Sequence, residues 1–354
     1  MKRIFGLFMI GVMLVSMTAC AKNSAGDLPG HTTISIDKKE ESIELFAMDT
    51  YMTVTAYGNQ AKCALQVAET RIRQLERLWS VIDPESELYM VNHSNGVPMD
   101  VDKVTSKAIS FALSMADRTA GALDPTIYPV LTSWGFTTGS YQIPSQDELD
   151  SLLQLVGYDK VLLDGQKITV PEGMQMDLGA VAKGYTADIV MSILKDQGIT
   201  SALIDLGGNI QTVGYKPDGS KWRVGIKDAY GDGNIGVLTV ADCAVVSSGG
   251  YERYFIGDDG QTYWHIIDPS TGKPADSGLV SATVVCKEGR LGDALSTALF
   301  VMGLQDAETQ WRECGDFEMI LMTQNNELYI TEGLEADFAL NQSHDGMPVH
   351  VIEK

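Results

Sequence analysis

The sequence has little positive charge for its length. Its 354 residues include 26 Lys and Arg against 47 Asp and Glu, which gives a formal net charge of −21. No run of basic residues occurs that could form a face for a phosphate backbone, so nucleic acid is not expected as a partner. To bind a phosphorylated ligand, so acidic a chain would need local positive charge, which a metal ion or a helix N-terminus can supply.

Cysteine is also scarce, with five in the chain. The four that lie beyond the N-terminal region match no zinc or redox spacing, so neither a structural zinc site nor a dithiol centre is expected. We expect buried free thiols, although a disulfide remains open outside the cytoplasm and the sequence does not pair the cysteines. These four residues are Cys63, Cys243, Cys286 and Cys314.

A long apolar run is found at the N-terminus. Residues 4–17 follow Lys2 and Arg3 and are too few for a stable membrane span, which indicates a signal peptide. Thr18 and Ala19 before Cys20 resemble a bacterial lipobox, which predicts that Cys20 is acylated and becomes the first mature residue. Ordinary secretory cleavage near Ala19 is the alternative.

The sequence is predicted to have three parts. Residues 1–19 are the predicted lipoprotein signal peptide, residues 20–40 a flexible tether of small and polar residues, and residues 41–354 the catalytic domain. The expected location is extracytoplasmic, with the protein anchored by lipid to a bacterial membrane.

Hydrophobic periodicity predicts helices and strands without regular βα alternation, which favours an α+β fold with mixed or antiparallel sheets and flanking helices. Helices are expected at residues 62–79, 102–120, 145–156, 291–302 and 307–314. Residues 121–136 contain Asp124-Pro125 and Pro129, which predicts an ordered loop with no regular element. Such a loop could form a binding wall, or its aromatic residues could simply pack.

Residues 176–188 contain the first candidate functional motif. A strand end turns at Gly179 and continues as a helix, whose free N–H groups and positive dipole end can receive an anion. Asp177 and Lys183 stand on either side of this opening. The alternative is an ordinary joint between a strand and a helix, with Asp177 as its cap.

Two further sites are candidates. Asp293, Ser296 and Thr297 fall at positions i, i+3 and i+4 near a helix start, on one face, and their oxygens suit Mg²⁺. Asp293 could instead be only the helix N-cap. His265 lies between strand and tight-loop signals, where it could act as a base on a hydroxyl or be a hydrogen-bonded structural histidine.

Eight motifs, in order over about residues 45–329, together resemble the ApbE family of FAD:protein FMN transferases, once labelled thiamine biosynthesis lipoproteins. They are Met-Asp-Thr at 48–50, Gly-Ala-Leu-Asp-Pro-Thr at 121–126, Trp-Gly-Phe at 134–136, Asp-Leu-Gly-Ala-Val-Ala-Lys-Gly-Tyr at 177–185, Leu-Gly-Gly-Asn-Ile at 206–210, Ser-Gly at 248–249 with Tyr251 and Arg253, His-Ile-Ile-Asp-Pro at 265–269 with Thr-Gly at 271–272, and Asp-Ala-Leu-Ser-Thr at 293–297. The resemblance implies an ApbE-like, T-fold-related architecture.

The resemblance also implies an activity, in which FMN passes from the substrate FAD to a Thr or Ser hydroxyl of an acceptor protein and AMP is released. Mg²⁺ would be held by the Ala180 carbonyl with Asp293 and Thr297, and Ser296 stands where some members have Asp. His265 would be the base, and Asp293 is counted with it as catalytic. The implied flavin and adenine contacts are Met48, Ala122, Leu123, Asp124, Asp177, Lys183 and Ile267.

The sequence departs from the family at two positions, since Asp49 replaces the usual Gly and Ile82 replaces an aromatic found in some members. The family's acceptor signature, a Ser/Thr-Gly-Ala-Thr run, is absent here, which implies a separate acceptor that carries a flavinylation motif, such as a membrane redox complex subunit. Two alternatives are a Mg²⁺-dependent FAD pyrophosphatase, in which water replaces the hydroxyl, and a lipoprotein that binds FAD without turnover.

Overall fold

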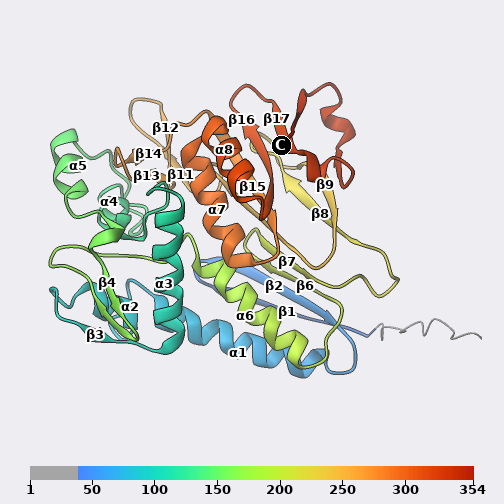
Figure 1. Ribbon diagram of the computed structural model, residues 1–354, viewed down its shortest axis with the longest axis horizontal. Coiled ribbons are helices and arrows are strands. Elements are labelled where there is room, and N and C mark those ends of the chain that lie inside the picture. Colours follow the sequence, from blue (N-terminus) through green and yellow to red (C-terminus); the bar gives the residue numbers. More distant parts are fainter. Residues whose placement is uncertain (1–38) are drawn as a thin grey trace, which may run out of the picture. The chain divides into compact units, whose positions relative to one another are not determined.

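The computed structural model describes residues 39–354. The predicted signal peptide, the lipidation site Cys20 and nearly all of the predicted tether therefore lie outside the described residues. Within residues 39–354, no helix combines the length and the apolar character that a membrane crossing requires. The described residues form an α+β fold (Figure 1), as the sequence predicts.

The central feature is a nine-stranded sheet. Neighbouring strands are antiparallel except for the last pair, β17 and β19, which is parallel and makes the sheet mixed. The strand order is β1 (Glu40–Ala47), β2 (Thr50–Tyr57), β6 (Ala202–Leu206), β7 (Asn209–Val213), β10 (Ala244–Gly249), β15 (Leu279–Cys286), β16 (Phe317–Thr323), β17 (Leu328–Thr331) and β19 (Val349–Ile352).

This sheet is covered on both faces around its central strands, whereas one face of β1 and β2 is exposed. Four helices cover one face, namely α1 (Ala61–Trp79), α6 (Ala182–Asp196), α7 (Gly289–Met302) and α8 (Leu304–Cys314). A small sheet in the order β18 (Phe338–Leu340), β9 (Asn234–Val240), β8 (Trp222–Lys227) shares a core with the other face. Strand β16 shows why: Met319 and Leu321 face the helices, and the alternate Ile320 packs in the core with Trp222.

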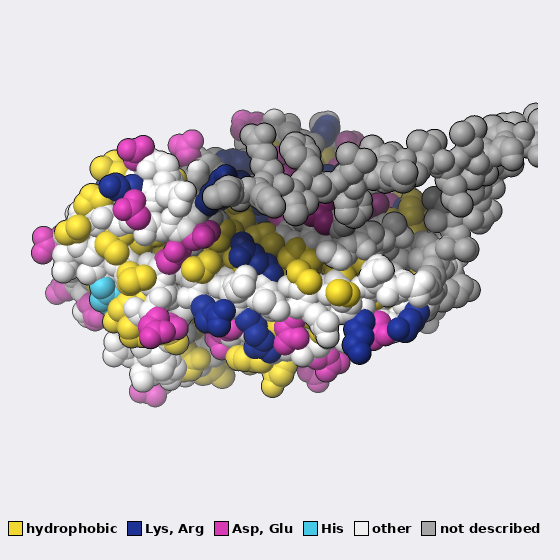
Figure 2. All heavy atoms as spheres, turned by 90° about the horizontal axis from the view of Figure 1, so that it is seen from below, with side chains coloured by type: hydrophobic (Ala, Val, Ile, Leu, Met, Phe, Trp, Pro, Cys, Tyr) yellow, Lys and Arg dark blue, Asp and Glu magenta, His cyan; other side chains and the backbone are white. Residues whose placement is uncertain are grey.

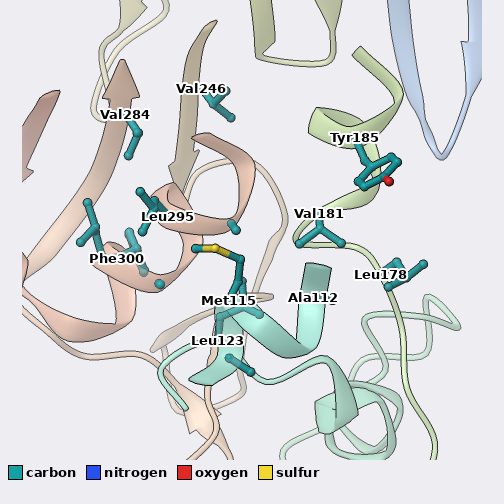
Figure 3. Close-up of a cluster of buried hydrophobic side chains, with 14 of the residues drawn as sticks. Ala112, Met115, Leu123, Leu178, Val181, Tyr185, Val246, Val284, Leu295 and Phe300 are labelled. Atoms are coloured by element: carbon teal, nitrogen blue, oxygen red, sulfur yellow. The ribbon is translucent and has the colours of Figure 1, made fainter. Parts of the chain in front are cut away.

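Residues 80–175 form an insertion between α1 and α6. It contains α2 (Glu87–Asn92), β3 (Met99–Asp100), α3 (Lys103–Arg118), α5 (Gln146–Leu153), β4 (Leu162–Asp164) and β5 (Lys167–Thr169). Figure 3 shows Met115 of α3 in one buried cluster with Val181 and with Leu295 of α7. The insertion therefore packs against the two segments that contain candidate functional residues, 176–188 and 293–297.

The prediction that residues 121–136 contain no regular element is wrong. The structure has a 3₁₀ helix at Pro125–Ile127 and the short helix α4 at Tyr128–Ser133. Both prolines stand at the first or second position of their helix, where a backbone N–H has no partner inside the helix and the fixed φ of proline suits the turn. Proline therefore starts these helices instead of preventing them.

The expectation of buried thiols is wrong for two cysteines. Cys63 and Cys314 are exposed free thiols, Cys243 is half-buried, and Cys286 is buried. On α1, the small apolar residues Ala61 and Ala64 face the core. Residue 63 is turned away from that face by the helical period, which explains its exposure.

Positive charge is dispersed over the face that carries α1. In the part of Figure 2 that grey atoms do not cover, Lys and Arg side chains are interspersed with Asp and Glu. One such pair, Arg73 and Glu69, is an i, i+4 ion pair of 3.0 Å on α1.

Helices α6 and α7 cross at unusually short range because glycine lies at the contact. A Cβ atom added to Gly184 would overlap the carbonyl oxygen of Gly289 and lie 2.7 Å from the Cβ of Asp293. No side chain can stand between the helices at this point. The crossing fixes where the first turn of α6 meets the second turn of α7.

We predict that Gly184→Ala destabilises the protein by about 1–3 kcal/mol, because the added methyl group overpacks this crossing. Urea unfolding measures the change in free energy. Gly233→Ala is the matched control, since a Cβ at Gly233 would meet no atom within 4 Å. Equal stabilities of the two variants would contradict the prediction.

Candidate active site

The site is centred on the contact between α6 and α7. The amide N–H of Gly184 donates to Oδ2 of Asp293 at 2.8 Å, and Nζ of Lys183 lies 3.7 Å from Oδ1 of the same carboxylate. Asp293 is 3% exposed. The structure thus brings together two predicted segments that are more than a hundred residues apart in the sequence.

Asp293 is not the N-cap of α7, so the alternative reading of this residue does not hold. The helix begins at Gly289, which places Asp293 in its second turn. The N-terminus is capped by Asp188 of α6, whose oxygens accept from the amides of Gly289 at 2.7 Å and Arg290 at 3.2 Å. Asp293 therefore does not cap its own helix; its Oδ2 accepts instead from an amide in the first turn of α6.

Sequence reasoning missed Asp188. Its carboxylate also accepts a hydrogen bond of 2.7 Å from Nε2 of Gln211 on β7. Burial raises the pKa of Asp188, and these hydrogen bonds oppose that rise. Its position one helical turn after Gly184 was the available signal, since both residues then face the same neighbour. We regard Asp188 as a positioning residue that fixes the start of α7.

The turn before α6 leaves one main-chain oxygen available. Oδ1 of Asp177 accepts from the amide of Gly179 at 2.7 Å, and the Asp177 amide donates to the Pro125 carbonyl at 2.8 Å. In the described part of the chain, no main-chain N–H donates to the Ala180 carbonyl. The amide four residues on belongs to Gly184 in the first turn of α6, where a main-chain N–H has no partner inside the helix, and it donates to Asp293.

Hydrogen bonds fix Asp177 and the residue before it. Burial raises the pKa of its carboxyl, and the hydrogen bond from Gly179 opposes the rise. The side chain of Asn92 holds the preceding residue at both ends, because Nδ2 donates to the Met176 carbonyl and Oδ1 accepts from the Met176 amide, each at 2.8 Å. Asn92 was noted in the sequence only as part of a loop, whereas it ends helix α2.

The hydroxyls of α7 are held from the sheet. Oγ of Ser248 on β10 lies 2.9 Å from Oγ of Ser296 and 3.3 Å from Oγ1 of Thr297. Both hydroxyls also donate to the main-chain carbonyl of Asp293, at 3.0 and 3.3 Å. Ser296 is fully buried and Thr297 is half-buried. Thr297 is thus the more accessible of the two predicted hydroxyl ligands.

His265 directly follows β12 (Thr262–Trp264) and lies beside β11 (Tyr254–Ile256). Its amide donates to the Arg253 carbonyl at 3.1 Å, and its ring nitrogen Nδ1 lies 3.3 Å from the same oxygen. A carbonyl can only accept, so this contact requires a proton on Nδ1 and leaves Nε2 free to accept one. Burial lowers the pKa of His265 to about 4, helped by the positive charges of Arg253 and Lys183.

Met48, the first of the implied flavin and adenine contacts, lies at the turn between β1 and β2. Its amide donates to Oε1 of Glu76 at 2.8 Å, and its sulfur lies 3.7 Å from Oγ1 of Thr186 on α6. Met48 and Asp49 both have positive φ, of 48° and 59°. Asp is one of the few residues besides Gly that tolerates this region, so the turn keeps its left-handed form where the family usually has Gly.

Four other implied flavin and adenine contacts are fixed by hydrogen bonds or core packing within the protein, or lie half-buried beside it. The Asp124 carboxylate accepts from the Thr126 amide at 2.8 Å and from the Tyr158 amide at 3.0 Å, and so caps the 3₁₀ helix. Leu123 and Ile267 are 4% and 6% exposed and pack in hydrophobic cores, while Ala122 is half-buried. The flavin and adenine contacts expected of these residues stay predictions.

The donor set fits a magnesium ion that is shared with a phosphate ligand. Residues 39–354 contain no cluster of three or more His, Cys, Asp or Glu side chains that could hold a metal by themselves. The available oxygens of Ala180, Asp293 and Thr297 are hard donors with one negative charge. Mg²⁺ binds such small sets because it keeps several waters and takes further oxygens from phosphates.

Comparison with known proteins places the chain in one family of enzymes. The family model that matches, the ApbE family, covers residues 48–321. A curated relative from Klebsiella pneumoniae, named FAD:protein FMN transferase, is 32% identical over 83% of this chain and 93% of its own length. A second relative of that name, from Treponema pallidum, is 30% identical over 90% of this chain and 93% of its own length. The chain belongs to the ApbE family.

Solved structures agree with this assignment. The crystal structure of the ApbE protein from Thermotoga maritima matches with a TM-score of 0.80 and 29% identity, over 84% of this chain and 99% of that one. The flavin transferase ApbE from Vibrio cholerae matches with a TM-score of 0.76 and 25% identity, over 84% of this chain and all of that one. The α+β fold of the described residues is that of the family.

We predict that His265 titrates with a midpoint near 4 in the free protein, as burial and the neighbouring cations imply. Its pKa in the unfolded chain is about 6.5. Below that pH the unfolded state binds a proton that the native state does not, so stability falls as pH falls from 6.5 towards 4. NMR of histidine-labelled protein measures the midpoint, with His265→Gln to assign the signal.

Arg253→Gln removes one of the two cations and should raise this midpoint towards 6.5. Urea unfolding at several pH values should show, in His265→Gln, a smaller loss of stability between pH 6.5 and 4 than in the wild type. A wild-type midpoint between 6 and 7 would show that His265 is solvated and that the described environment is wrong.

Proposed function

We propose that the chain acts as its curated relatives are named, as an FAD:protein FMN transferase, and that it joins FMN through its phosphate to a Thr or Ser hydroxyl of an acceptor protein with the help of Mg²⁺. The observation that carries this proposal is the contact of Asp293 with Lys183 and Gly184. A carboxylate, an ammonium group and the start of a helix meet there, and the Ala180 carbonyl, two residues before that helix, accepts no main-chain hydrogen bond in the described residues. This combination suits a metal-bound pyrophosphate.

The reaction balances without an external oxidant or reductant. The acceptor hydroxyl oxygen forms a bond to the FMN phosphorus, the phosphorus–oxygen bond to the AMP side breaks, and AMP leaves with the bridging oxygen. Bound Mg²⁺ would neutralise charge that develops on the phosphates. Lys183 and the first turn of α6 add fixed positive charge in a chain that is otherwise strongly acidic.

His265 is suited to take the proton of the attacking hydroxyl. Because its pKa lies well below 7, the imidazole is neutral at physiological pH and can accept a proton. The Arg253 carbonyl holds the proton on Nδ1, so that Nε2 is the nitrogen that can accept one. Arg253 is itself fixed by an ion pair of 2.5 Å with Asp49, so the turn that carries Met48 and the base are tied together.

A Mg²⁺-dependent FAD pyrophosphatase is the second candidate, since water can take the place of the hydroxyl at the same site. Ile82, where some family members have an aromatic residue, is 70% exposed and offers no ring for stacking. Weaker retention of the flavin would favour release of FMN over transfer. A lipoprotein that binds FAD without turnover is the third reading.

We further propose that Cys20 anchors the enzyme to the outer side of a bacterial membrane. This part of the proposal is supported by the sequence alone. The acceptor would then be a protein exposed at that surface, such as a subunit of a membrane redox complex that carries a flavinylation motif.

One experiment separates the three readings. The protein is incubated with FAD, Mg²⁺ and an acceptor domain that carries a Ser-Gly-Ala-Thr run. Flavin fluorescence on the denatured acceptor supports the transferase. Release of AMP and FMN without labelling supports the pyrophosphatase, and tightly bound FAD without either product supports the binding protein.

We predict that Asp293→Asn lowers the rate of transfer at least about 100-fold, because it removes the one carboxylate of the proposed metal site. Calorimetry with Mg²⁺ and FAD should show weaker metal binding in this variant. Asp306→Asn, at an exposed position in the first turn of α8, is the control and should be unchanged. Wild-type activity of Asp293→Asn at saturating Mg²⁺ would refute the metal assignment.

A further inference from the structure

Asn209, the first residue of β7, has a buried amide without a partner. Its side chain is fully buried, and among the residues that the structure describes neither Oδ1 nor Nδ2 has a hydrogen-bond partner. In Gln211, also fully buried, only Oε1 lacks a partner, because Nε2 donates to Asp188 at 2.7 Å. An amide taken out of water without a partner lowers the stability of a fold. Packing alone therefore does not explain an asparagine at this position.

The Asn209 side chain faces the layer of helices that covers the sheet. Residues two apart in a strand point to the same side, and Gln211 points to the helices because it bonds to Asp188 of α6. Strand β7 contacts both α6 and α7. The amide of Asn209 is therefore buried where the sheet meets these two helices.

The pairing of β7 with β10 shows which turn of α7 is nearest. Asn209 lies directly opposite Val246, and residues opposite each other share one face of a sheet. The Cγ2 atom of Val246 would lie 2.7 Å from a Cβ atom added to Gly292. Gly292 directly precedes Asp293, so Asn209 lies at the level of the turn of α7 that carries the Asp293 carboxylate.

Contacts on either side agree with this level. Towards one end of the sheet, Nε2 of Gln211 would overlap a Cβ atom added to Gly289, the first residue of α7. Towards the other end, Oγ of Ser248 on β10 lies 2.9 Å from Oγ of Ser296, in a later turn of the same helix. Asn209 therefore lies between the start of α7 and its hydroxyls, which is where the helix carries the carboxylate of the proposed metal site.

We propose that Asn209 is a positioning residue of the metal site, and that its Oδ1 accepts a hydrogen bond from a water molecule of the Mg²⁺ ion that Asp293 binds. This inference rests on the Mg²⁺ site of the proposed function. Mg²⁺ keeps several waters when it binds to a protein, and outer groups that bond to the ligands of a metal hold it in place. A neutral amide can do so without placing a second, unpaired carboxylate in the interior.

The groups around Asp293 leave this task to another residue. Its Oδ2 accepts from the Gly184 amide, and its Oδ1 lies 3.7 Å from Nζ of Lys183. The Ser296 hydroxyl donates to the main-chain carbonyl of Asp293. Acceptors for the waters of the ion must come from other groups, and on the side of the sheet Asn209 offers an oxygen that has no partner in the described part of the chain.

The first measurement is the stability of the metal-free protein, by urea unfolding at pH 8 with EDTA. Asn209→Leu keeps the branched shape without polar atoms, and Asn209→Val is smaller, in case Leu does not fit beneath the helices. The urea midpoint of the variant that fits should be no lower than that of the wild type, because a buried amide without a partner is removed. Asn209→Asp should lower the midpoint, because it buries a carboxylate.

The second measurement is the affinity for Mg²⁺, by calorimetry with FAD and without an acceptor protein. Asn209→Leu and Asn209→Val lose the acceptor oxygen and should weaken binding about 10- to 100-fold. Asn209→Asp keeps an acceptor and adds a negative charge, so its affinity should equal or exceed that of the wild type. The two measurements should thus rank the apolar variants and the Asp variant in opposite orders, whereas a residue that only supports the fold would lower both quantities together.

Ser201→Ala is the matched control. Ser201 is also fully buried, and its Oγ has no hydrogen-bond partner within residues 39–354. It directly precedes β6, whose other end leads into the turn before Asn209, so the length of a strand separates it from the site. This variant should keep the wild-type affinity for Mg²⁺.

The outcomes separate this inference from the proposed function. Wild-type affinity for Mg²⁺ in both apolar variants would overturn the role of Asn209, and so would a lower urea midpoint in both, since Asn209 would then support the fold. If Asp293→Asn weakens Mg²⁺ binding and the Asn209 variants do not, the metal site stands and only this inference falls. A wild type that binds no Mg²⁺ in the presence of FAD would refute the metal site itself.

Discussion

The rest of the structure depends on the short crossing of α6 and α7. Gly184 and Gly289 allow the helices to approach until the Gly184 amide bonds directly to the Asp293 carboxylate. That bond satisfies an amide in the first turn of α6 that has no partner inside the helix, and among the described residues no main-chain N–H donates to the Ala180 carbonyl. A larger side chain at either glycine would separate the helices and move Asp293 away from Lys183 and the first turn of α6.

The crossing is stabilised from three sides. Asp188 holds the start of α7, Ser248 of β10 holds its hydroxyls, and the insertion packs α3 beneath the turn that leads into α6. Because these supports belong to the protein itself, they can fix the direction of the functional groups before a ligand binds. The proposed base, His265, belongs to a different kind of element, the hairpin of β11 and β12, whose residues are exposed or half-buried.

Helices with a clear apolar period were predictable, and α1 and α3 end within two residues of their expected bounds. The failures have physical causes. Pro125 and Pro129 were read as preventing structure, although proline starts a helix well. The short helix α2 has too few residues to show a period, and its Asn92 is recognisable only from its contact with Met176.

The sequence by itself determined the class of fold, the family and the residues to suspect, because motif order and periodicity are local properties of the chain. It also carried Cys20 and the predicted anchor. Only the tertiary structure decided that Asp293 contacts the first turn of α6 instead of capping its own helix, that Asp188 performs that capping, and that the ring of His265 contacts the carbonyl of Arg253. These facts depend on contacts between residues far apart in the chain, which no local pattern encodes.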